Sequence, residues 1–438
     1  MNRLSRFSFW LTSIASAQWL FFILANTIVV PLTVGAAFEL SSDGITDLLR
    51  NSLIFTGIAC MLQGVVGHRF PIMEGHSGVL WGVVLNLCLS APSMGISLTT
   101  VGGGIATGML LAGVIVILLA AFDMLSFLPR LIKPQVMSVF LFLLTFQLII
   151  IYFKGMLGKT EDGSLDIPRT LFALGIVVFV LVLHIKGRRA IGHFSLLIGM
   201  AAGWGLYSLL FPYGQSSAGV AAMFDITLFP LGMPNLNTGI VVVTLLACIV
   251  DLSNTFTTVR SVSGLFREYE IGARLKRSFL LNGFFNLCAA TLGLVTYAPF
   301  ASTLSFLKST RIVDRKPFLI GGGLMMLLGL IPSMSHIIAK FPIIVGNAVL
   351  FVIYLQLLGT SLKSLEGKVF DSITIYRIAI PVLTGLGIMN VDADVFRDLP
   401  VLMQSLISNG LIMGVLLSIM LEMFVKWDKG AEVEKELQ

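Results

Sequence analysis

The sequence predicts an all-α polytopic membrane protein with 14 transmembrane segments arranged as a 7+7 inverted repeat. Three observations predict this fold. Apolar residues form 56% of the 438-residue chain and charged residues only 12%, whereas soluble domains carry roughly a quarter. Apolar runs of about 20 residues, the length that crosses a bilayer as a helix, recur from end to end. Short glycine-rich patterns recur about half a chain apart, which indicates a repeat. Because the apolar runs extend over the whole chain, we expect one membrane-embedded body rather than two or three soluble domains.

Charged residues, prolines and glycine clusters divide the apolar runs into segments. The expected segments cover residues 12–37, 52–67, 75–90, 101–122, 134–153, 168–185, 190–211, 236–257, 277–295, 297–307, 317–334, 342–360, 372–390 and 401–424. The third and the tenth are too short to cross a bilayer as single helices, which need about 20 residues. We therefore expect both of these segments to be interrupted.

The first segment also has features of a signal peptide. Arg3 and Arg6 precede it, and Ala15-Ser16-Ala17 resembles a small-residue cleavage site. The apolar run nevertheless continues to Val34, which is typical of a retained membrane span. We favour a retained first segment, with cleavage of residues 1–17 as the alternative.

The basic residues indicate the orientation of the chain. With the N-terminus in the cytoplasm, the clusters at 186–189, 260–277 and 308–316 all lie inside, as the positive-inside rule requires. Of the 29 Lys and Arg, only six then lie outside: Arg50, Lys154, Lys159, Arg169, Lys340 and Arg397. We expect both termini to be cytoplasmic.

Composition and motifs exclude several function classes. The net charge of +6 comes without a basic stripe that carries aromatic residues, so we expect no nucleic-acid partner. The four cysteines lie in apolar stretches without metal-like or redox spacing. We find no nucleotide-binding glycine loop and no Cys/His ligand cluster in the sequence. We therefore expect no metal, no cofactor, no ATP-driven pumping and no enzyme activity.

An internal repeat links the third and fourth segments to the tenth and eleventh. Gly102–Gly104 opens the fourth segment, and Gly321–Gly323 lies near the start of the eleventh, 219 residues later. Gly78 in the third segment and Ala298 in the tenth are 220 residues apart. Because seven is odd, the second half enters from the opposite side of the membrane, so the repeat is inverted. Paired short segments interrupted by Gly or Pro indicate the midplane site of a transporter; ordinary loops are the alternative.

Asp251 is the one carboxylate deep inside an otherwise apolar segment. Placing Asp at the centre of a membrane helix costs about 2.5 to 3.5 kcal/mol, so its presence indicates ligand or proton binding in the bundle interior. Its carboxyl group accepts hydrogen bonds and, when protonated, also donates one. The alternative is a structural carboxylate that caps a broken helix beside Ser253, Asn254 and Thr255.

Other polar and aromatic side chains are weaker candidates. Glu74 and His76 stand at the entrance of the third segment, where a titratable pair could relay protons; a loop ion pair is the alternative. Gln18 in the first segment could hydrogen-bond either a ligand or another helix. Tyr297 and Phe300 could stack on a planar ligand or serve only in packing.

These segments resemble the nucleobase:cation symporters of the uracil/xanthine permease family over most of the chain. Gln18-Trp19, followed by Val29-Val30-Pro31, is similar to the first-segment pattern of that family, with Trp in place of His. Residues 75–80 resemble its Gly-x-Ser-Phe-Ala-Phe segment, with Gly78 in place of the aromatic residue whose backbone contacts the base. Residues 341–348 are similar to its Ile-Pro-x-Pro-Val-x-Gly-Gly signature.

The resemblance also implies roles for individual residues. Asp251 falls where the family carries its substrate-binding Glu, and Thr255 falls where it has His or Asp. Pro299 stands where the tenth segment usually offers Glu or Gln to the base. The implied substrate-binding residues are Asp251, Gly78, Ala298, Tyr297, Phe300, Ser77, Thr255 and Gln18, and the implied proton-coupling residues are Asp251, Glu74 and His76.

The implied architecture is a core domain that moves against a gate domain, with two short strands meeting between half-helices at their boundary. The core would comprise residues 1–125 and 236–337, the gate residues 126–212 and 338–426, and a cytoplasmic tail residues 427–438. The resemblance further implies a multi-pass protein of the bacterial cell (inner) membrane, surrounded by the lipid bilayer, and a homodimer is an additional expectation.

The implied function is the import of a purine or pyrimidine nucleobase, coupled to protons or alternatively to Na⁺. An anion transporter of the sulfate or dicarboxylate type on the same fold is the runner-up, because Pro299 removes an acidic group from the tenth segment. A non-transporting membrane scaffold or sensor is the third hypothesis, but it does not explain the carboxylate of Asp251 deep in an apolar segment.

Overall fold

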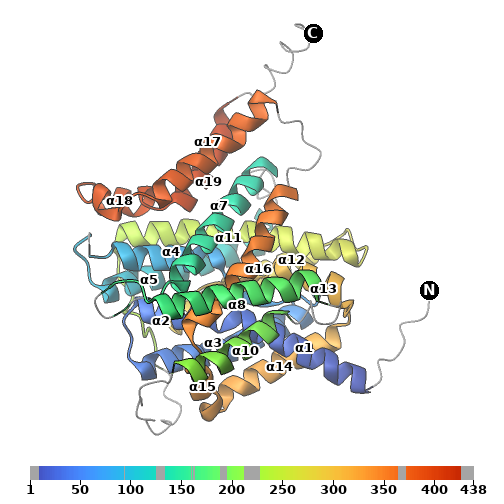
Figure 1. The fold of residues 1–438 in the computed structure, drawn as a ribbon. Coiled ribbons are helices and arrows are strands. Elements are labelled where there is room, and N and C mark those ends of the chain that lie inside the picture. Colours follow the sequence, from blue (N-terminus) through green and yellow to red (C-terminus); the bar gives the residue numbers. More distant parts are fainter. Residues whose placement is uncertain are drawn as a thin grey trace.

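The structure is a computed structural model in which regular secondary structure is almost entirely helical (Figure 1). It describes residues 9–92, 94–124, 134–158, 160, 163–187, 195–211, 227–363 and 371–425. The expected start of the gate domain at residue 126 and the expected tail at 427–438 lie outside the described residues.

The first half of the chain follows the predicted order of segments. Its elements are α1 (Phe9–Thr27), α2 (Val29–Ala37), α3 (Ser42–Val65), β1 (Glu74–His76), α4 (Gly78–Ser90), α5 (Leu98–Ala121), α7 (Pro134–Met156), α8 (Ile167–Lys186) and α10 (Ser195–Leu210). The third segment is β1 followed by the 13-residue α4, so its predicted interruption is confirmed.

The second half repeats this order. Its elements are α11 (Thr238–Leu265), α12 (Gly272–Thr291), β2 (Tyr297–Pro299), α13 (Ser302–Thr310), α14 (Arg315–Leu330), α15 (Pro332–Ala339), α16 (Ile343–Lys363), α17 (Ser372–Met389), the 3₁₀ turn η2 (Ala393–Phe396), α18 (Val401–Ile407) and α19 (Gly410–Phe424). The tenth segment is β2 followed by the nine-residue α13, an interruption that matches the third segment. The eleventh segment is divided before Pro332, since proline disfavours a helical residue directly before it.

The second segment begins earlier than the sequence predicts. α3 starts at Ser42, ten residues before the expected boundary, because the Ser41 hydroxyl accepts a backbone hydrogen bond from the first turn. Because the first turns of α3 are polar, the apolar run begins later than the helix does. Arg50, expected among the external charges, is only 5% exposed within α3 and pairs with Asp47 at 3.0 Å.

Seven of the described helical stretches are long and apolar enough to cross a membrane by themselves. They are Trp10–Ala37, Ser42–Val65, Leu98–Ala121, Ser138–Met156, Ile167–Lys186, Thr238–Leu265 and Ser372–Met389. Shorter apolar helices, among them α4 and α19, belong to the remaining segments. The fold is therefore that of a polytopic membrane protein, as predicted.

The helices pack as two groups. In the first, α5 packs against α11 and α12, and α14 packs against α1 and α3. In the second, α7 packs against α16, α17 and α19, while α8 and α10 pack against α16. Figure 1 shows α17, α18 and α19, in orange to red, gathered on the opposite side of the molecule from α14 and α15. Contacts between the groups are less extensive and join α4 to α7, α2 to α16 and α11 to α18. This division has the form of a core and a gate.

The two glycine triplets allow helices of opposite repeats to approach closely. A Cβ atom at Gly104 of α5 would lie 2.8 Å from Cγ2 of Ile240 on α11. A Cβ atom at Gly321 of α14 would lie 2.7 Å from Cβ of Trp19 on α1. One glycine of each triplet therefore packs against the first helix of the other repeat. This reciprocal packing interleaves the two halves and gives the glycine spacing of the sequence a structural reason.

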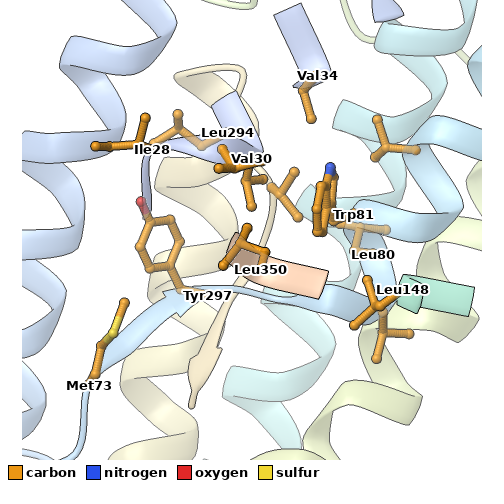
Figure 2. Packing of buried hydrophobic residues seen from close by; sticks show 14 of the residues in the cluster. Ile28, Val30, Val34, Met73, Leu80, Trp81, Leu148, Leu294, Tyr297 and Leu350 are labelled. Carbon is orange, nitrogen blue, oxygen red and sulfur yellow. The ribbon is translucent and has the colours of Figure 1, made fainter. Parts of the chain in front are cut away.

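The largest apolar cluster surrounds the two strands. Figure 2 shows Ile28, Val30, Leu80, Trp81 and Tyr297 among the buried side chains of this cluster. Trp81 and Tyr297 are each 1% exposed. The interruptions of the third and tenth segments thus lie inside protein, where a membrane protein tolerates irregular backbone.

Candidate functional site

The two interrupted segments meet in a two-stranded sheet. β1 and β2 pair antiparallel, with Gly75 opposite Ala298 and Glu74 opposite Pro299. The short strands implied by the family resemblance are therefore present. Because bonded and non-bonded pairs alternate in an antiparallel ladder, Glu74 and Pro299 form a non-hydrogen-bonded pair. Two backbone hydrogen bonds extend the ladder: Phe300 N to Met73 O (2.9 Å) and Ser77 N to Thr296 O (2.7 Å).

One face of this sheet contacts α3, and we call it the α3 face. The His76 Nε2 atom lies 2.5 Å from Ser52 Oγ, and the Tyr297 hydroxyl lies 3.0 Å from Thr56 Oγ1. Glu74 belongs to this face because side chains alternate along a strand, and it is fully buried. The α3 face is thus a buried layer of polar side chains within the first group of helices.

The opposite face of the sheet carries Gly75, Ala298 and Phe300, and we call it the α11 face. The Phe300 ring covers Gly75, because a Cβ atom at Gly75 would lie 2.7 Å from Phe300 Cε2. Ser77 ends this face and caps α4, its hydroxyl accepting a hydrogen bond from Leu80 N at 3.4 Å. The α11 face therefore presents two small residues, one aromatic ring and a helix N-terminus.

Asp251 lies beside this helix N-terminus and is 5% exposed. Its carboxylate accepts hydrogen bonds from the side chains of Ser77 and Asn254. Its Oδ1 atom is buried and has no hydrogen-bond partner among the described residues. Two donors and the positive end of the α4 dipole support a negative charge at this position. Asp251 therefore offers one free acceptor oxygen next to the sheet.

Pro299 fits β2 without loss of a ladder hydrogen bond. It occupies the non-hydrogen-bonded pair, where no N–H of this strand is required. Its carbonyl oxygen accepts a hydrogen bond from Asn254 Nδ2 at 3.4 Å. α11 thus contributes Asp251 and also holds the outer edge of β2.

Thr255 takes part in a chain of hydrogen bonds between helices. Its Oγ1 accepts a hydrogen bond from Asn282 Nδ2 of α12 at 2.8 Å, and Asn282 Oδ1 accepts one from Gln63 Nε2 of α3 at 2.7 Å. The chain joins α11, α12 and α3. Its geometry is that of helix packing, and it supplies no evidence of ligand contact for Thr255.

Gly78 and Ala298 do not occupy corresponding positions, contrary to the alignment of the repeats drawn from sequence. Ala298 is the central residue of β2 and pairs with Gly75, whereas Gly78 is the first residue of α4. A short strand has no periodicity long enough to set its register from sequence, which explains the shift of three residues. Gln18, on α1, has a buried Oε1 atom without a partner among the described residues.

α7 also contributes to the site, and its residues are not among the sequence predictions. The Gln147 amide fills the space beside Gly82 of α4 that a Cβ atom there would need, and Gln147 Oε1 is buried without a partner among the described residues. Leu148 Cδ1 would lie 3.1 Å from a Cβ atom at Gly78. A polar residue inside an apolar segment was the available signal, as it was for Asp251.

His68, in the connection between α3 and β1, is a second missed residue. Its Nε2 lies 3.2 Å from Glu74 Oε1, and its Nδ1 accepts a hydrogen bond from Phe70 N at 3.0 Å. Its carbonyl oxygen accepts a hydrogen bond from Arg274 Nη1 at 3.2 Å. Burial and then the Arg274 guanidinium lower the pKa of His68 to about 3. His68 is therefore neutral and donates its single N–H to Glu74.

The described residues contain no group of three or more His, Cys, Asp or Glu side chains that could hold a metal ion. Three of the cysteines are buried and Cys288 is half-buried, all with free thiols. The chemistry available at the sheet is therefore hydrogen bonding, stacking and proton transfer.

Solved structures of anion transporters have the same fold. The transmembrane domain of a cyanobacterium bicarbonate transporter, BicA, superposes with a TM-score of 0.61 at 13% identity, covering 93% of this chain and 96% of BicA. The murine anion transporter Slc26a9 in its inward-facing state gives a TM-score of 0.65 at 13% identity, covering 97% of this chain and 69% of that protein. The likeness shows the 7+7 inverted-repeat fold with core and gate, and no more.

Sequence relatives are permeases, which are not enzymes. The putative purine permease YwdJ of Bacillus subtilis (strain 168) is 28% identical, with 94% of this chain and 96% of YwdJ aligned. The uric acid permease PucJ of the same organism is 25% identical over 93% of this chain and 91% of PucJ, and its xanthine permease is 23% identical over 94% and 93%. Residues 11–393 match the model of the permease family that covers xanthine and uracil permeases. With relatives aligned over nearly their whole length, the chain belongs to the xanthine/uracil permease family.

Proposed function

We propose that this permease is a secondary active transporter that imports a nucleobase together with protons. The observation that carries the proposal is the free Oδ1 atom of Asp251, buried beside the α4 N-terminus and the α11 face of the sheet. A nucleobase is planar and displays N–H donors and carbonyl acceptors along its edge. Such a ligand matches one carboxylate acceptor, a helix N-terminus and an aromatic ring.

In the proposed binding mode, Asp251 accepts an N–H of the base, and the backbone at Gly78, in the first turn of α4, binds the remaining edge. Ala298, whose backbone groups pair with Gly75, lies against the base. Phe300 stacks on the base, and Ser77 keeps Asp251 oriented through the hydrogen bond between them. Gln18 on α1 supplies an additional polar contact. Tyr297 shapes the site from the α3 face, and its hydroxyl is already bonded to Thr56. The names of the relatives, which include uric acid, xanthine and purine permeases, favour a purine.

Transport in this proposal requires the core to move against the gate. The core comprises residues 1–125 and 236–337, and the gate comprises residues 126–212 and 338–426. Gln147 and Leu148 of α7 cover the start of α4 and would have to separate from it on opening. We also propose the orientation with both termini in the cytoplasm and assembly as a homodimer.

The proton in this proposal is carried by one of three buried groups: Asp251, Glu74 or His76. All three lie at the sheet or directly beside it and are at most 5% exposed. A proton-motive force can drive uptake only if at least one of them changes its protonation during the cycle.

Uptake into proteoliposomes tests the proposed function. The purified protein is reconstituted, and labelled xanthine, uric acid and uracil are offered with and without an inward proton gradient. We expect gradient-stimulated uptake of at least one base and its loss in Asp251→Asn, while Asp43→Asn, at an exposed carboxylate, retains it. Full gradient-driven uptake by Asp251→Asn would contradict the role of this carboxylate.

Anion transport is the second candidate, favoured by the fold shared with BicA and Slc26a9 and by the absence of an acid at Pro299. The same proteoliposomes offered labelled sulfate, bicarbonate and a dicarboxylate distinguish the two functions. Anion uptake with inert nucleobases would select this candidate, and flux of any solute excludes a non-transporting scaffold.

A further inference from the structure

We infer that Glu74 is the proton-binding group of this transporter, and that His68 determines the atom, Oε2, on which the proton resides. The inference rests on the proposed function and adds to it the identity of the proton-coupling group. It assigns the two faces of the sheet to two tasks: ligand binding on the α11 face and proton binding on the α3 face.

Glu74 has a less complete environment than Asp251, the other buried carboxyl group near the sheet. It is 0% exposed, and its Oε1 atom accepts a 3.2 Å hydrogen bond from His68 Nε2. Its Oε2 atom is buried and has no partner among the described residues. A buried carboxylate with one bare oxygen is costly, and a proton on that oxygen removes the charge.

His68 restricts the proton to Oε2. Because His68 Nδ1 accepts the Phe70 N–H, the ring carries its only proton on Nε2 and directs it at Oε1. The Arg274 guanidinium donates to the His68 carbonyl and lies 4.7 Å from the centre of the Phe70 ring. Its positive charge opposes protonation of His68. On uptake, H⁺ forms one O–H bond at Oε2 and no other bond breaks. On release, that O–H bond breaks and the proton passes to water.

Asp251 has the opposite character. Two side-chain donors and the α4 N-terminus support its charge, and its free Oδ1 faces the proposed ligand site. The two carboxyl groups interact electrostatically. A proton on Glu74 therefore removes a repulsion and lets Asp251 accept a ligand N–H as the ionised carboxylate. By linkage, the bound ligand favours the proton to the same extent, which is the requirement for symport.

The surroundings of Glu74 suit a proton better than Na⁺. The titratable and charged groups around Glu74 are His68 in the connection, Cys60 on α3, His76 on β1, Tyr297 on β2 and, through His68, Arg274 on α12, while Asp251 of α11 acts electrostatically from the other face of the sheet. Among these groups, side-chain oxygens belong only to Asp251 and to Tyr297, whose hydroxyl is already bonded to Thr56, whereas a hard cation requires several oxygen ligands. The Cys60 thiol bonds the backbone of Glu74 and leaves the carboxyl group without a further donor.

The test separates exchange from accumulation in proteoliposomes. Exchange of labelled base against unlabelled base, without any gradient, reports binding and core movement. Accumulation under an inward proton gradient, recorded with a pH dye inside the vesicles, reports coupling. For Glu74→Gln, which keeps the size and Oε1 as an acceptor for His68, we expect exchange within about twofold of wild type, since uncoupled binding is unchanged. Accumulation and proton entry should both be lost.

Two results would overturn the inference: proton-driven accumulation by Glu74→Gln, and loss of exchange in folded Glu74→Gln. Both leave proton-coupled nucleobase uptake by the wild type in place, so they are distinct from failure of the proposed function, in which the wild type shows no proton-driven uptake of a base.

Two further variants keep the test decisive. Glu74→Asp retains the acid but withdraws it from His68, and we expect coupled uptake with a displaced pH profile even if Glu74→Gln does not fold. His68→Gln retains an N–H donor for Oε1, and we expect it to preserve coupling, whereas His68→Leu should displace the pH profile. An unchanged profile in both Glu74→Asp and His68→Leu contradicts the positioning role.

Discussion

The two interrupted segments have the same order of elements but different chemistry. β1 and the start of α4 carry Glu74, His76 and Ser77, all buried, and Ser77 caps the helix. β2 and α13 carry Pro299 within the strand, and α13 begins without a side-chain cap because Ala301 occupies that position. The comparison teaches that the inverted repeat preserves the backbone frame of the site in both halves, while the polar side chains are concentrated in one.

Adding an acid to β2 is the strongest way to break this asymmetry. Pro299→Glu would place a second carboxylate directly opposite Glu74, in the pair where side chains approach most closely. Like charges in this position repel, and we expect gradient-free exchange of labelled base to fall by about tenfold or more, equivalent to ~1.4 kcal/mol.

Two matched variants test the cause of that loss. Pro299→Ala should retain exchange because the ladder requires no N–H at this position. The double variant Glu74→Gln with Pro299→Glu should recover most of the exchange, since one of the two charges is gone. Wild-type exchange by Pro299→Glu would contradict charge repulsion between positions 74 and 299.

The frame of the fold could be predicted from the sequence, because membrane segments are defined by long apolar runs. The short third and tenth segments were recognisable because they were too short for a bilayer. The start of α3 could not be predicted in this way, because its first turns are polar and only the single residue Ser41 marks its N-terminus. Arg50, expected among the external charges, is buried within α3.

The site was only partly predictable. Asp251 stood out because a lone acid in an apolar segment is costly, and the structure places it at the sheet. Which residue faces which side depends on the register of two three-residue strands, and no sequence period exists over that length. His68 was equally hidden, because its partnership with Glu74 depends on the path of an irregular connection.

Ser77 and Ala301 offer an intermediate test, because they occupy the cap positions of the two half-helices. Ser77→Ala removes the cap of α4 and one donor to Asp251. Hydrogen bonds to charged groups contribute about 1.5 to 3 kcal/mol, so we expect the KM for uptake to rise roughly tenfold. Ser77→Thr should restore most of the affinity.

The reverse change on α13 should have little effect. Ala301 has helical backbone angles (φ −61°, ψ −30°), whereas a capping hydroxyl acts from an extended residue such as Ser77 (φ −62°, ψ 122°). Because a serine with these angles cannot cap α13, Ala301→Ser should leave the KM within about twofold of wild type. A large gain in affinity would mean that the introduced hydroxyl does cap α13. The difference between the two half-helices would then lie in their side chains alone and not in their backbone angles.

The smallest expected effect concerns the connections that lead into the strands, since His68 precedes β1 and no titratable side chain lies between α12 and Tyr297. The pKa of His68 is about 3 in the folded protein, against about 6.5 for an ordinary histidine. Between these values the unfolded chain binds a proton that the folded protein excludes. The contribution of His68 to stability is therefore complete above pH 6.5 and is lost as the pH falls below that value.

Melting temperatures in detergent, measured from pH 7.5 to pH 5, should fall less for His68→Gln than for wild type. His184→Gln, at an exposed histidine, should behave as wild type, and an equal fall in His68→Gln would contradict the neutral, donating state of His68 on which Glu74 depends.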